Sequence, residues 1–255
     1  MSLFSQCLVS CGGRHGGPGR GCGYWGHSRK KKGDCLKVSK HSRCAIVGGG
    51  DINSYSAVEP LLLGSFVISA DSGLRHCRAM GVRPDLLVGD FDSHKGPIPT
   101  DIPRVIFDPL KKDYTDSTFA LEEALERGAG EILFAGMLGG RLDHTLANLQ
   151  NLARCAQLGV ACRLTDGVTD VWAAKGPAHF TVPFAAEHYF SLLAHSDDCH
   201  GVTIRGAQYA LDRHTLSSVL PRAVSNEFAK GDAQIQWEDG VLLITRCPKA
   251  LSPRA

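Results

Sequence analysis

Residues 85–93 read Asp-Leu-Leu-Val-Gly-Asp-Phe-Asp-Ser, a short apolar run that ends in glycine and is followed at once by acids. Two other stretches are built in a similar way: Cys-Ala-Ile-Val-Gly-Gly-Gly at 44–50 and Ser-Phe-Val-Ile-Ser-Ala-Asp at 65–71. Further apolar runs lie at 104–107 and 131–136. Near-continuous apolar runs of this length indicate strands that are buried on both faces, and they therefore predict a parallel sheet.

Helical patterns separate several of these runs. One covers 118–127, and another covers 143–158, where Leu146, Leu149, Leu152 and Cys155 share one face. Strands that alternate with helices predict an α/β domain, which we place at 44–166 and expect to be a Rossmann-like parallel-sheet domain.

The pattern of apolar and polar residues changes after residue 166. Short apolar segments alternate with turns and no long helical pattern follows, which predicts a small all-β sandwich domain at 167–247 and a tail at 248–255. The turn Glu238-Asp239-Gly240 indicates a hairpin. The expected strands cover 170–174, 178–182, 189–194, 201–205, 233–237 and 241–246.

Residues 1–43 form a Gly-rich basic leader that we expect to be disordered, because it has too little apolar surface to bury. It contains nine Lys or Arg and one acid, so the rest of the chain carries a net charge of −6. A mildly acidic body argues against nucleic-acid binding. The chain lacks a run of 18 apolar residues and a basic signal-peptide start, so we expect no membrane span, a cytoplasmic protein and reduced, mostly buried thiols.

Acidic residues follow the predicted strands. Asp71 comes directly after 65–70, and Asp90 and Asp92 come after 85–88. In an extended segment Asp90 and Asp92 would point to the same side, with Phe91 in the core. The carboxyl ends of the strands form the ligand crevice of an open α/β sheet. Carboxylates gathered there repel one another unless a cation is present, and Mg²⁺ prefers a few carboxylates plus phosphate oxygens.

These acids predict a Mg²⁺ site made by Asp71, Asp90 and Asp92. The alternative is that each acid caps a helix or makes a turn. That alternative explains one acid better than three acids at successive strand ends.

Glycines and basic residues accompany the acids. Gly49 and Gly140 allow backbone N–H groups to approach phosphate oxygens, and Lys112 and Arg141 supply the positive charge that a transferred phosphate requires. His144 either contacts phosphate or starts a helix without a ligand role. Neither a P-loop motif nor a dinucleotide-binding glycine motif is present, which argues against both classes of site.

Several motifs follow one another in a specific order. They are Ala70-Asp-Ser-Gly73, Pro84-Asp-Leu-Leu-Val-Gly-Asp-Phe-Asp-Ser93, Lys112-Asp-Tyr-Thr-Asp116, Gly139-Gly-Arg-Leu-Asp-His144, Gly206-Ala-Gln-Tyr-Ala-Leu211 and Val224-Ser-Asn-Glu227. This ordered set resembles the thiamine pyrophosphokinase family of the bacterial type over residues 44–247. The chain departs from the family pattern at Ser72, where a glycine is expected, and at Thr118, where an acidic or amide side chain is common.

The resemblance implies an enzyme that transfers the diphosphate of ATP to the hydroxyl of thiamine and forms thiamine diphosphate and AMP. ATP and Mg²⁺ would occupy the acidic crevice. The implied catalytic residues are Asp71, Asp90, Asp92 and Asp116. The implied ATP-binding residues are Gly49, Ser93, Lys112, Asp113, Gly140, Arg141, Asp143 and His144.

The resemblance further implies a homodimer whose active site lies between the α/β domain of one subunit and the β domain of the other. Thiamine would stack on Tyr209, with Ser225 and Asn226 nearby, since a cationic thiazolium gains from an aromatic face. The alternative for Tyr209 is a core aromatic of the β domain.

Two other functions compete with this one. A Mg²⁺-dependent nucleotide phosphohydrolase would use the same acids but would not need Tyr209. A non-catalytic sensor of thiamine or nucleotide would be expected to lack some of the carboxylates, and all of them are present.

Overall fold

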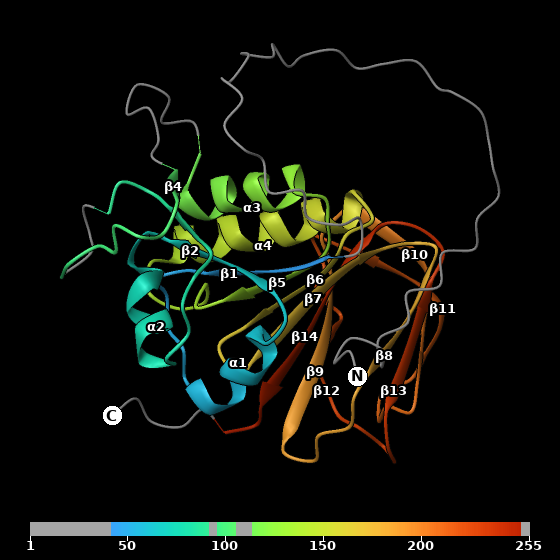
Figure 1. Ribbon diagram of the computed structural model, residues 1–255. Coiled ribbons are helices and arrows are strands. Elements are labelled where there is room, and N and C mark those ends of the chain that lie inside the picture. Colours follow the sequence, from blue (N-terminus) through green and yellow to red (C-terminus); the bar gives the residue numbers. More distant parts are fainter. Residues whose placement is uncertain (1–41, 92–95, 106–113, 251–255) are drawn as a thin grey trace, which may run out of the picture.

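The computed structural model describes residues 42–91, 96–105 and 114–250 (Figure 1). Within them the α/β part contains six strands that pair in parallel in the order β6-β5-β1-β2-β3-β4. Their bounds are β1 Ser42–Val47, β2 Phe66–Ala70, β3 Leu86–Val88, β4 Arg104–Val105, β5 Ala129–Ala135 and β6 Ala161–Thr165. The predicted parallel sheet is confirmed. β1 begins two residues earlier than expected, and β6 was missed because Arg163 interrupts its apolar run.

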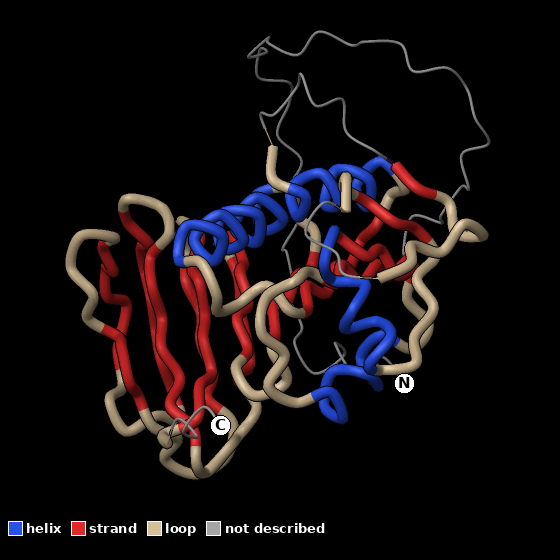
Figure 2. The backbone as a smooth tube through the Cα atoms, turned by 90° about the vertical axis from the view of Figure 1, so that its left-hand side faces the viewer, coloured by secondary structure: helices blue, strands red, loops and turns tan. Residues whose placement is uncertain are grey.

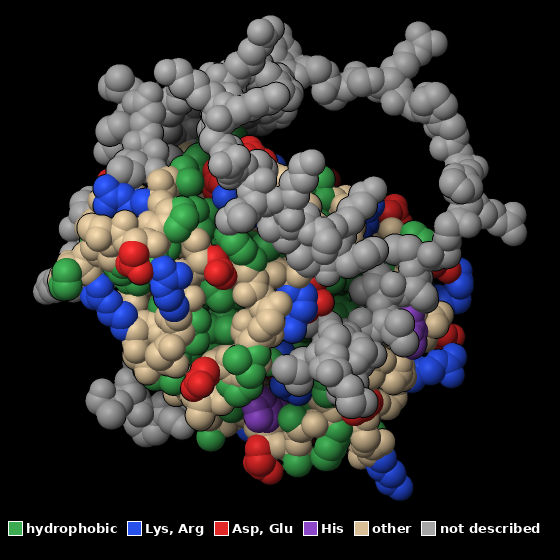
Figure 3. All heavy atoms as spheres, viewed as in Figure 1, with side chains coloured by type: hydrophobic (Ala, Val, Ile, Leu, Met, Phe, Trp, Pro, Cys, Tyr) green, Lys and Arg blue, Asp and Glu red, His purple; other side chains and the backbone are tan. Residues whose placement is uncertain are grey.

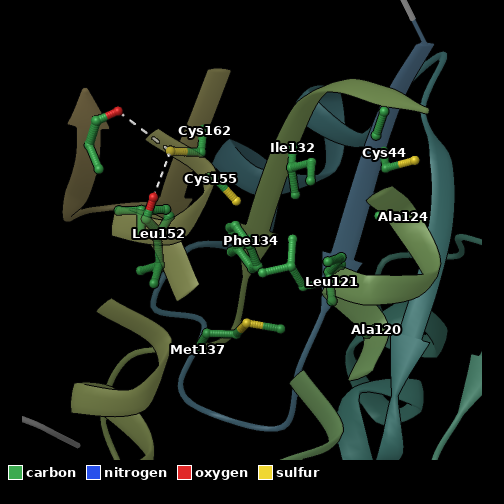
Figure 4. Close-up of a cluster of buried hydrophobic side chains, with 14 of the residues drawn as sticks. Cys44, Ala120, Leu121, Ala124, Ile132, Phe134, Met137, Leu152, Cys155 and Cys162 are labelled. Atoms are coloured by element: carbon green, nitrogen blue, oxygen red, sulfur yellow. Dashed lines mark hydrogen bonds between the residues drawn. The ribbon is translucent and has the colours of Figure 1, made fainter. Parts of the chain in front are cut away.

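Helices cover both faces of this parallel sheet (Figure 1). α1 (Tyr55–Leu62) and α2 (Leu74–Ala79) lie on one face, and α3 (Asp116–Glu126) and α4 (Leu142–Gln157) lie on the other. The side chains of β1 from Cys44 to Val47 alternate between the two layers, so that each of these four positions is buried. Figure 4 shows Ile132 and Phe134 of β5 in the core that they share with Leu121 of α3.

The sheet does not end at β6. β7 (Asp170–Lys175) pairs with β6 in the antiparallel direction, and β14 (Val241–Pro248), β9 (His188–Ala194) and β12 (Ala223–Asn226) follow to complete a ten-stranded sheet. A second, antiparallel sheet has the order β11-β10-β13-β8. Its strands are β8 Ala178–Val182, β10 Asp198–Arg205, β11 Leu211–Ser217 and β13 Ala233–Trp237.

The four-stranded sheet packs against the β12-β9-β14-β7 end of the long sheet. The core between them includes Trp172, Phe180, Phe190, Ile204 and Trp237. The predicted β-sandwich is therefore present, but one of its two sheets continues from the α/β part instead of being separate from it. Figure 2 shows this continuity, with the strands of the sandwich on the left and α4 running above the junction.

A buried ion cluster lies at the junction. Asp170, which is 3% exposed, accepts hydrogen bonds from Arg163 Nη2 at 2.6 Å and from Arg246 Nη2 at 2.6 Å. Both guanidinium groups also lie 5.7 Å from the centre of the Trp172 ring. Because Arg163, Asp170 and Arg246 come from β6, β7 and β14, the cluster connects the two parts of the sheet.

The described thiols agree with the expectation of reduced, buried cysteines. All six are free, and five of them are buried. Burial raises the pKa of the Cys44 thiol to about 11, so this thiol stays protonated at neutral pH. Among the described residues, none of the helices is long and apolar enough to cross a membrane. Acidic and basic side chains are interspersed on the face seen in Figure 3.

Candidate active site

A cleft of about 400 Å³ opens at the carboxyl ends of β1, β2 and β5. The strand order reverses here, because β2 lies on one side of β1 and β5 on the other. Ligands of open α/β sheets bind at such a switch point. The lining includes the predicted residues Gly49, Asp71, Asp116, Gly140, Arg141 and His144. A larger hollow of about 600 Å³ at one end of the sandwich, beside Lys175 and Asp239, contains none of the predicted residues.

Two of the predicted carboxylates meet around Gly89. A Cβ atom built on Gly89 would lie 3.2 Å from Asp116 Oδ1 and 3.3 Å from both Cα and Cβ of Asp71. Asp71 follows β2, Gly89 follows β3, and Asp116 begins α3, so three separate elements deliver this cluster. Asp90 continues the chain from Gly89 and is exposed. The structure therefore brings Asp71 and Asp116 together beside Asp90, while Asp92, Ser93, Lys112 and Asp113 lie outside the described residues.

The backbone beside these acids differs from the expectation in one respect. Phe91 has φ +63°, a left-handed conformation, so the segment from Asp90 is not the extended one that we assumed. Asp71 also has a positive φ, of +44°. The Phe91 side chain is 4% exposed and packs with Leu74 and Leu87, so its predicted place in the core is confirmed. Core packing of Phe91 thus outweighs the cost of its backbone conformation, which is roughly 1–3 kcal/mol.

One wall of the cleft is the glycine loop, residues 48–50. Gly48 N–H donates to Ala135 O at 2.9 Å and Gly50 N–H donates to Gly136 O at 2.6 Å, which ties the loop to the end of β5. A Cβ on Gly49 would collide with Ser72 Oγ. Ser72 is the first departure from the family pattern. Its hydroxyl occupies the position that a side chain at residue 49 would need, so it fits only because residue 49 is glycine.

The opposite wall is built from the facing surfaces of α3 and α4. Ser117 Oγ donates to Asn148 Oδ1 at 2.7 Å, and Asn148 Nδ2 donates to Met137 O at 3.0 Å. Ser117 and Asn148 line the cleft, and the sequence reasoning missed both. Thr118, the second departure, hydrogen-bonds with Asn151.

The buried face of α4 differs from the predicted one. Asn148 and Asn151 are buried, whereas Leu146 is 53% exposed. The predicted apolar stripe was wrong at Leu146 because polar contacts with α3 decide which face of α4 is buried. The two asparagines in an otherwise apolar pattern were the available signal.

Arg141, Asp143 and His144 lie at the start of α4. Arg141 Nη2 and Nε lie 2.6 Å and 3.1 Å from the two carboxylate oxygens of Asp143. The Arg141 guanidinium holds the pKa of the Asp143 carboxyl below its usual range. Arg141 and His144 line the cleft, whereas Asp143 contacts Arg141 from outside the lining. The described residues contain no group of three or more His, Cys, Asp or Glu side chains arranged to hold a metal ion.

The predicted thiamine-binding residues lie together in the β-sandwich. Tyr209 is 62% exposed, which excludes the alternative of a core aromatic. The buried Asn226 accepts from Tyr209 N–H at 3.0 Å and donates to Tyr209 O at 2.8 Å, so its amide holds the Tyr209 backbone. Ser225 has φ +57°, and its N–H donates to Ser191 Oγ at 3.0 Å.

Tyr209 and the acidic cleft lie far apart within one chain. Asn226, which holds Tyr209, ends β12 at one edge of the long sheet, whereas Asp71 follows β2, seven strands further along. At about 4.8 Å per strand this separation is roughly 30 Å. The strand order therefore places Asn226 and Asp71 in separate parts of the chain.

Comparisons with known proteins match two stretches of the chain. Residues 63–164 match the family model described as "Thiamin pyrophosphokinase, catalytic domain", and residues 179–242 match "Thiamin pyrophosphokinase, vitamin B1 binding domain". The thiamine pyrophosphokinase of Bacillus subtilis (strain 168) is 29% identical over 213 residues, which cover 79% of this chain and 96% of the relative.

Solved structures are similar as well. The crystal structure of thiamine pyrophosphokinase from Bacillus subtilis superimposes with a TM-score of 0.74 at 25% identity, over 82% of this chain and 100% of that one. The thiamin pyrophosphokinase of Geobacillus thermodenitrificans gives a TM-score of 0.67 at 26% identity, over 80% of this chain and 97% of that one. The similarity thus covers both the α/β part and the sandwich.

Proposed function

Because this chain belongs to the thiamine pyrophosphokinase family, we infer that it is a thiamine diphosphokinase, which transfers the diphosphate group of ATP to the hydroxyl of thiamine and releases AMP. One observation in the structure supports this function most directly. Asp71 and Asp116 meet at Gly89 in a cleft that the glycine loop also lines, at the switch point of the sheet. Carboxylates beside backbone amides are what a metal-bound polyphosphate requires.

The donor chemistry of the cleft suits a divalent cation that is held by few carboxylates and completed by phosphate oxygens. Asp71 and Asp116 lie close together with Asp90 beside them, and carboxylate oxygens are ligands that Mg²⁺ favours. We propose that Asp71 and Asp90 hold Mg²⁺, with Asp92 as a further ligand predicted from the sequence. When Mg²⁺ is bound, it neutralises part of the negative charge of the phosphates.

The chain's own residues divide the remaining tasks. The glycine loop and Gly140 present backbone groups to the phosphates, and Arg141, oriented by Asp143, offsets negative charge on the leaving group. The thiamine hydroxyl oxygen bonds to the β-phosphorus as the bond from that phosphorus to the AMP oxygen breaks. A carboxylate of the aspartate cluster accepts the hydroxyl proton.

We propose that a homodimer completes the site. Tyr209 is exposed, and the seven strand spacings between β12 and β2 favour a second subunit as the source of the aromatic face for thiamine. In this arrangement Asn226 holds the Tyr209 backbone, and Ser225, fixed by its bond to Ser191, lies beside Asn226 at the thiamine site.

AMP release from ATP, measured with and without thiamine, tests the function. The diphosphokinase releases AMP only when thiamine is present and forms thiamine diphosphate in equal amount. A phosphohydrolase releases products without thiamine, and a sensor binds the ligands without turnover. Asp71→Asn is the matched inactive control, since it removes one carboxylate charge with little change in shape.

The shared site has its own test. Asp71→Asn and Tyr209→Ala subunits are combined in a heterodimer that is purified with two affinity tags. One of its two sites then has an intact aspartate cluster and an intact Tyr209 from different chains, so a shared site gives activity with the wild-type KM for thiamine. A verified heterodimer whose KM for thiamine stays as high as that of the Tyr209→Ala homodimer contradicts the shared site, because a site within one chain always keeps one lesion.

A further inference from the structure

His76 is a buried histidine that the mechanism above does not use. It lies on α2, is 5% exposed, and both of its ring nitrogens have close partners. Nδ1 lies 2.7 Å from the Tyr55 hydroxyl, and Nε2 lies 2.7 Å from the carbonyl oxygen of Gly50. The His76 ring therefore bridges the start of α1 and the glycine loop that lines the cleft.

The partners determine the tautomer of His76. A carbonyl oxygen can only accept, so Nε2 carries the hydrogen and donates to Gly50 O, while Nδ1 accepts from the Tyr55 hydroxyl. Arg75 Nε lies 3.4 Å from the same Nε2, too far to compete with the 2.7 Å contact.

Two peptide groups of the glycine loop are held at both ends as a result. In the first, Gly49 O accepts from Arg75 Nη2 at 2.6 Å and Gly50 N–H donates to Gly136 O. In the second, Gly50 O accepts from His76 and Asp51 N–H donates to Leu138 O at 2.8 Å. Neither peptide group can rotate without losing hydrogen bonds that would be costly to leave unmade.

The consequence concerns the remaining amide of the loop. Gly48 N–H and Gly50 N–H are both used within the fold, whereas Gly49 N–H has no partner among the described residues. Gly49 also lines the cleft. The loop therefore keeps one donor for a ligand and turns two carbonyl oxygens, which would repel an anion, toward α2.

We propose that His76 is a positioning residue that sets the glycine loop for the phosphates of ATP, with Tyr55 fixing its tautomer. The proposal rests on the proposed function, because that function identifies the anion as ATP. His76 acts on the ATP side of the reaction only, since the predicted thiamine contacts belong to the sandwich. Its loss weakens ATP binding and leaves thiamine binding unchanged.

Two amide substitutions separate the two contacts of the ring. In His76→Gln the side-chain amide reaches the position of Nε2 and can still donate to Gly50 O. In His76→Asn the amide reaches only the position of Nδ1, so the partner of Tyr55 is kept and the bond to Gly50 is lost. His179→Asn, at an exposed histidine of β8, is the matched control.

Steady-state KM values for ATP and thiamine are measured for each variant. Calorimetric titration with ATP and Mg²⁺ in the absence of thiamine gives the Kd for ATP. Loss of one hydrogen bond predicts that His76→Asn raises both the KM and the Kd for ATP about tenfold. The KM for thiamine changes less than about twofold on the same basis, and His76→Gln and His179→Asn stay near wild type.

The proposal is overturned if the two His76 variants behave alike, or if the KM values for ATP and thiamine rise together, as a merely structural role predicts. If wild type releases no AMP with thiamine, the proposed function fails, and the Kd for ATP of the same variants still decides the role of His76. A wild-type protein that does not bind ATP overturns both.

Discussion

Replacing Gly89 by alanine places a methyl group at the point where the aspartates meet. The new Cβ would lie 3.2 Å from Asp116 Oδ1 and 3.3 Å from Asp71 Cα, inside ordinary van der Waals contact. Residue 89 also has φ +125°, a region that is unfavourable for any residue with a Cβ. The backbone cost is roughly 1–3 kcal/mol, and relief of the contacts requires Asp71 and Asp116 to move by a few tenths of an ångström.

Such a shift lowers turnover as well as stability. A misplacement of about 1 Å costs roughly a hundredfold in rate, so we expect Gly89→Ala to lower kcat about tenfold or more. Gly81→Ala is the matched control, because Gly81 has φ +66° and open space where its Cβ would lie. Its expected cost is about 1–2 kcal/mol in the free energy of unfolding, with unchanged kcat.

Urea denaturation gives the free energy of unfolding of both variants, and thiamine-dependent AMP release gives kcat. The reasoning is refuted if Gly89→Ala turns over at the wild-type rate. It is equally refuted if Gly81→Ala loses as much activity, since the effect would then belong to stability and not to the cleft.

Three further predictions use other parts of the molecule. Asp170→Asn leaves two half-buried arginines without their buried carboxylate and lowers the free energy of unfolding by about 3 kcal/mol, whereas Asp101→Asn, at an exposed ion pair, leaves it nearly unchanged in the same urea titration. Tyr209→Ala loses an aromatic–cation contact of roughly 1–2 kcal/mol, so it raises the KM for thiamine about five- to thirtyfold and leaves the KM for ATP unchanged. An unchanged KM for thiamine would show that Tyr209 does not contact thiamine. Burial lowers the pKa of His76 below 6.5, so the unfolded chain binds a proton at His76 more readily than the folded chain does. The free energy of unfolding therefore falls as the pH drops from 6.5 toward the pKa of the folded protein. His76→Gln removes this pH dependence, and an unchanged plot of stability against pH contradicts the burial argument.

Local patterns predicted the strands whose surroundings are simple. β8 and β13 have the expected bounds of 178–182 and 233–237, because their side chains alternate between core and surface. β11 was missed because Leu211–Ser217 is largely polar and becomes a strand through pairing with β10. The continuity of the sheet was missed for a similar reason, since the residue pattern of neither β6 nor β7 indicates that the two strands pair.

The part of the cleft that lies at the carboxyl ends of the parallel strands was predictable from the sequence. Acids at the ends of parallel strands converge, and this rule alone anticipates Asp71 at the crevice. The network of Ser117 and Asn148 depends on how α3 meets α4, and the left-handed conformation of Phe91 depends on the packing of its ring against Leu74 and Leu87. These features follow from tertiary contacts that local sequence patterns do not encode.

The unbroken sheet determines how the chain can be divided. A cut at Gly167 would separate β6 from β7 and leave each fragment with a bare row of backbone donors and acceptors, which is a template for aggregation. Val171 and Ala173 would lose their cover of α4, and the carboxylate of Asp170 would be parted from Arg163. We therefore expect neither part of the chain to fold stably when it is expressed without the other.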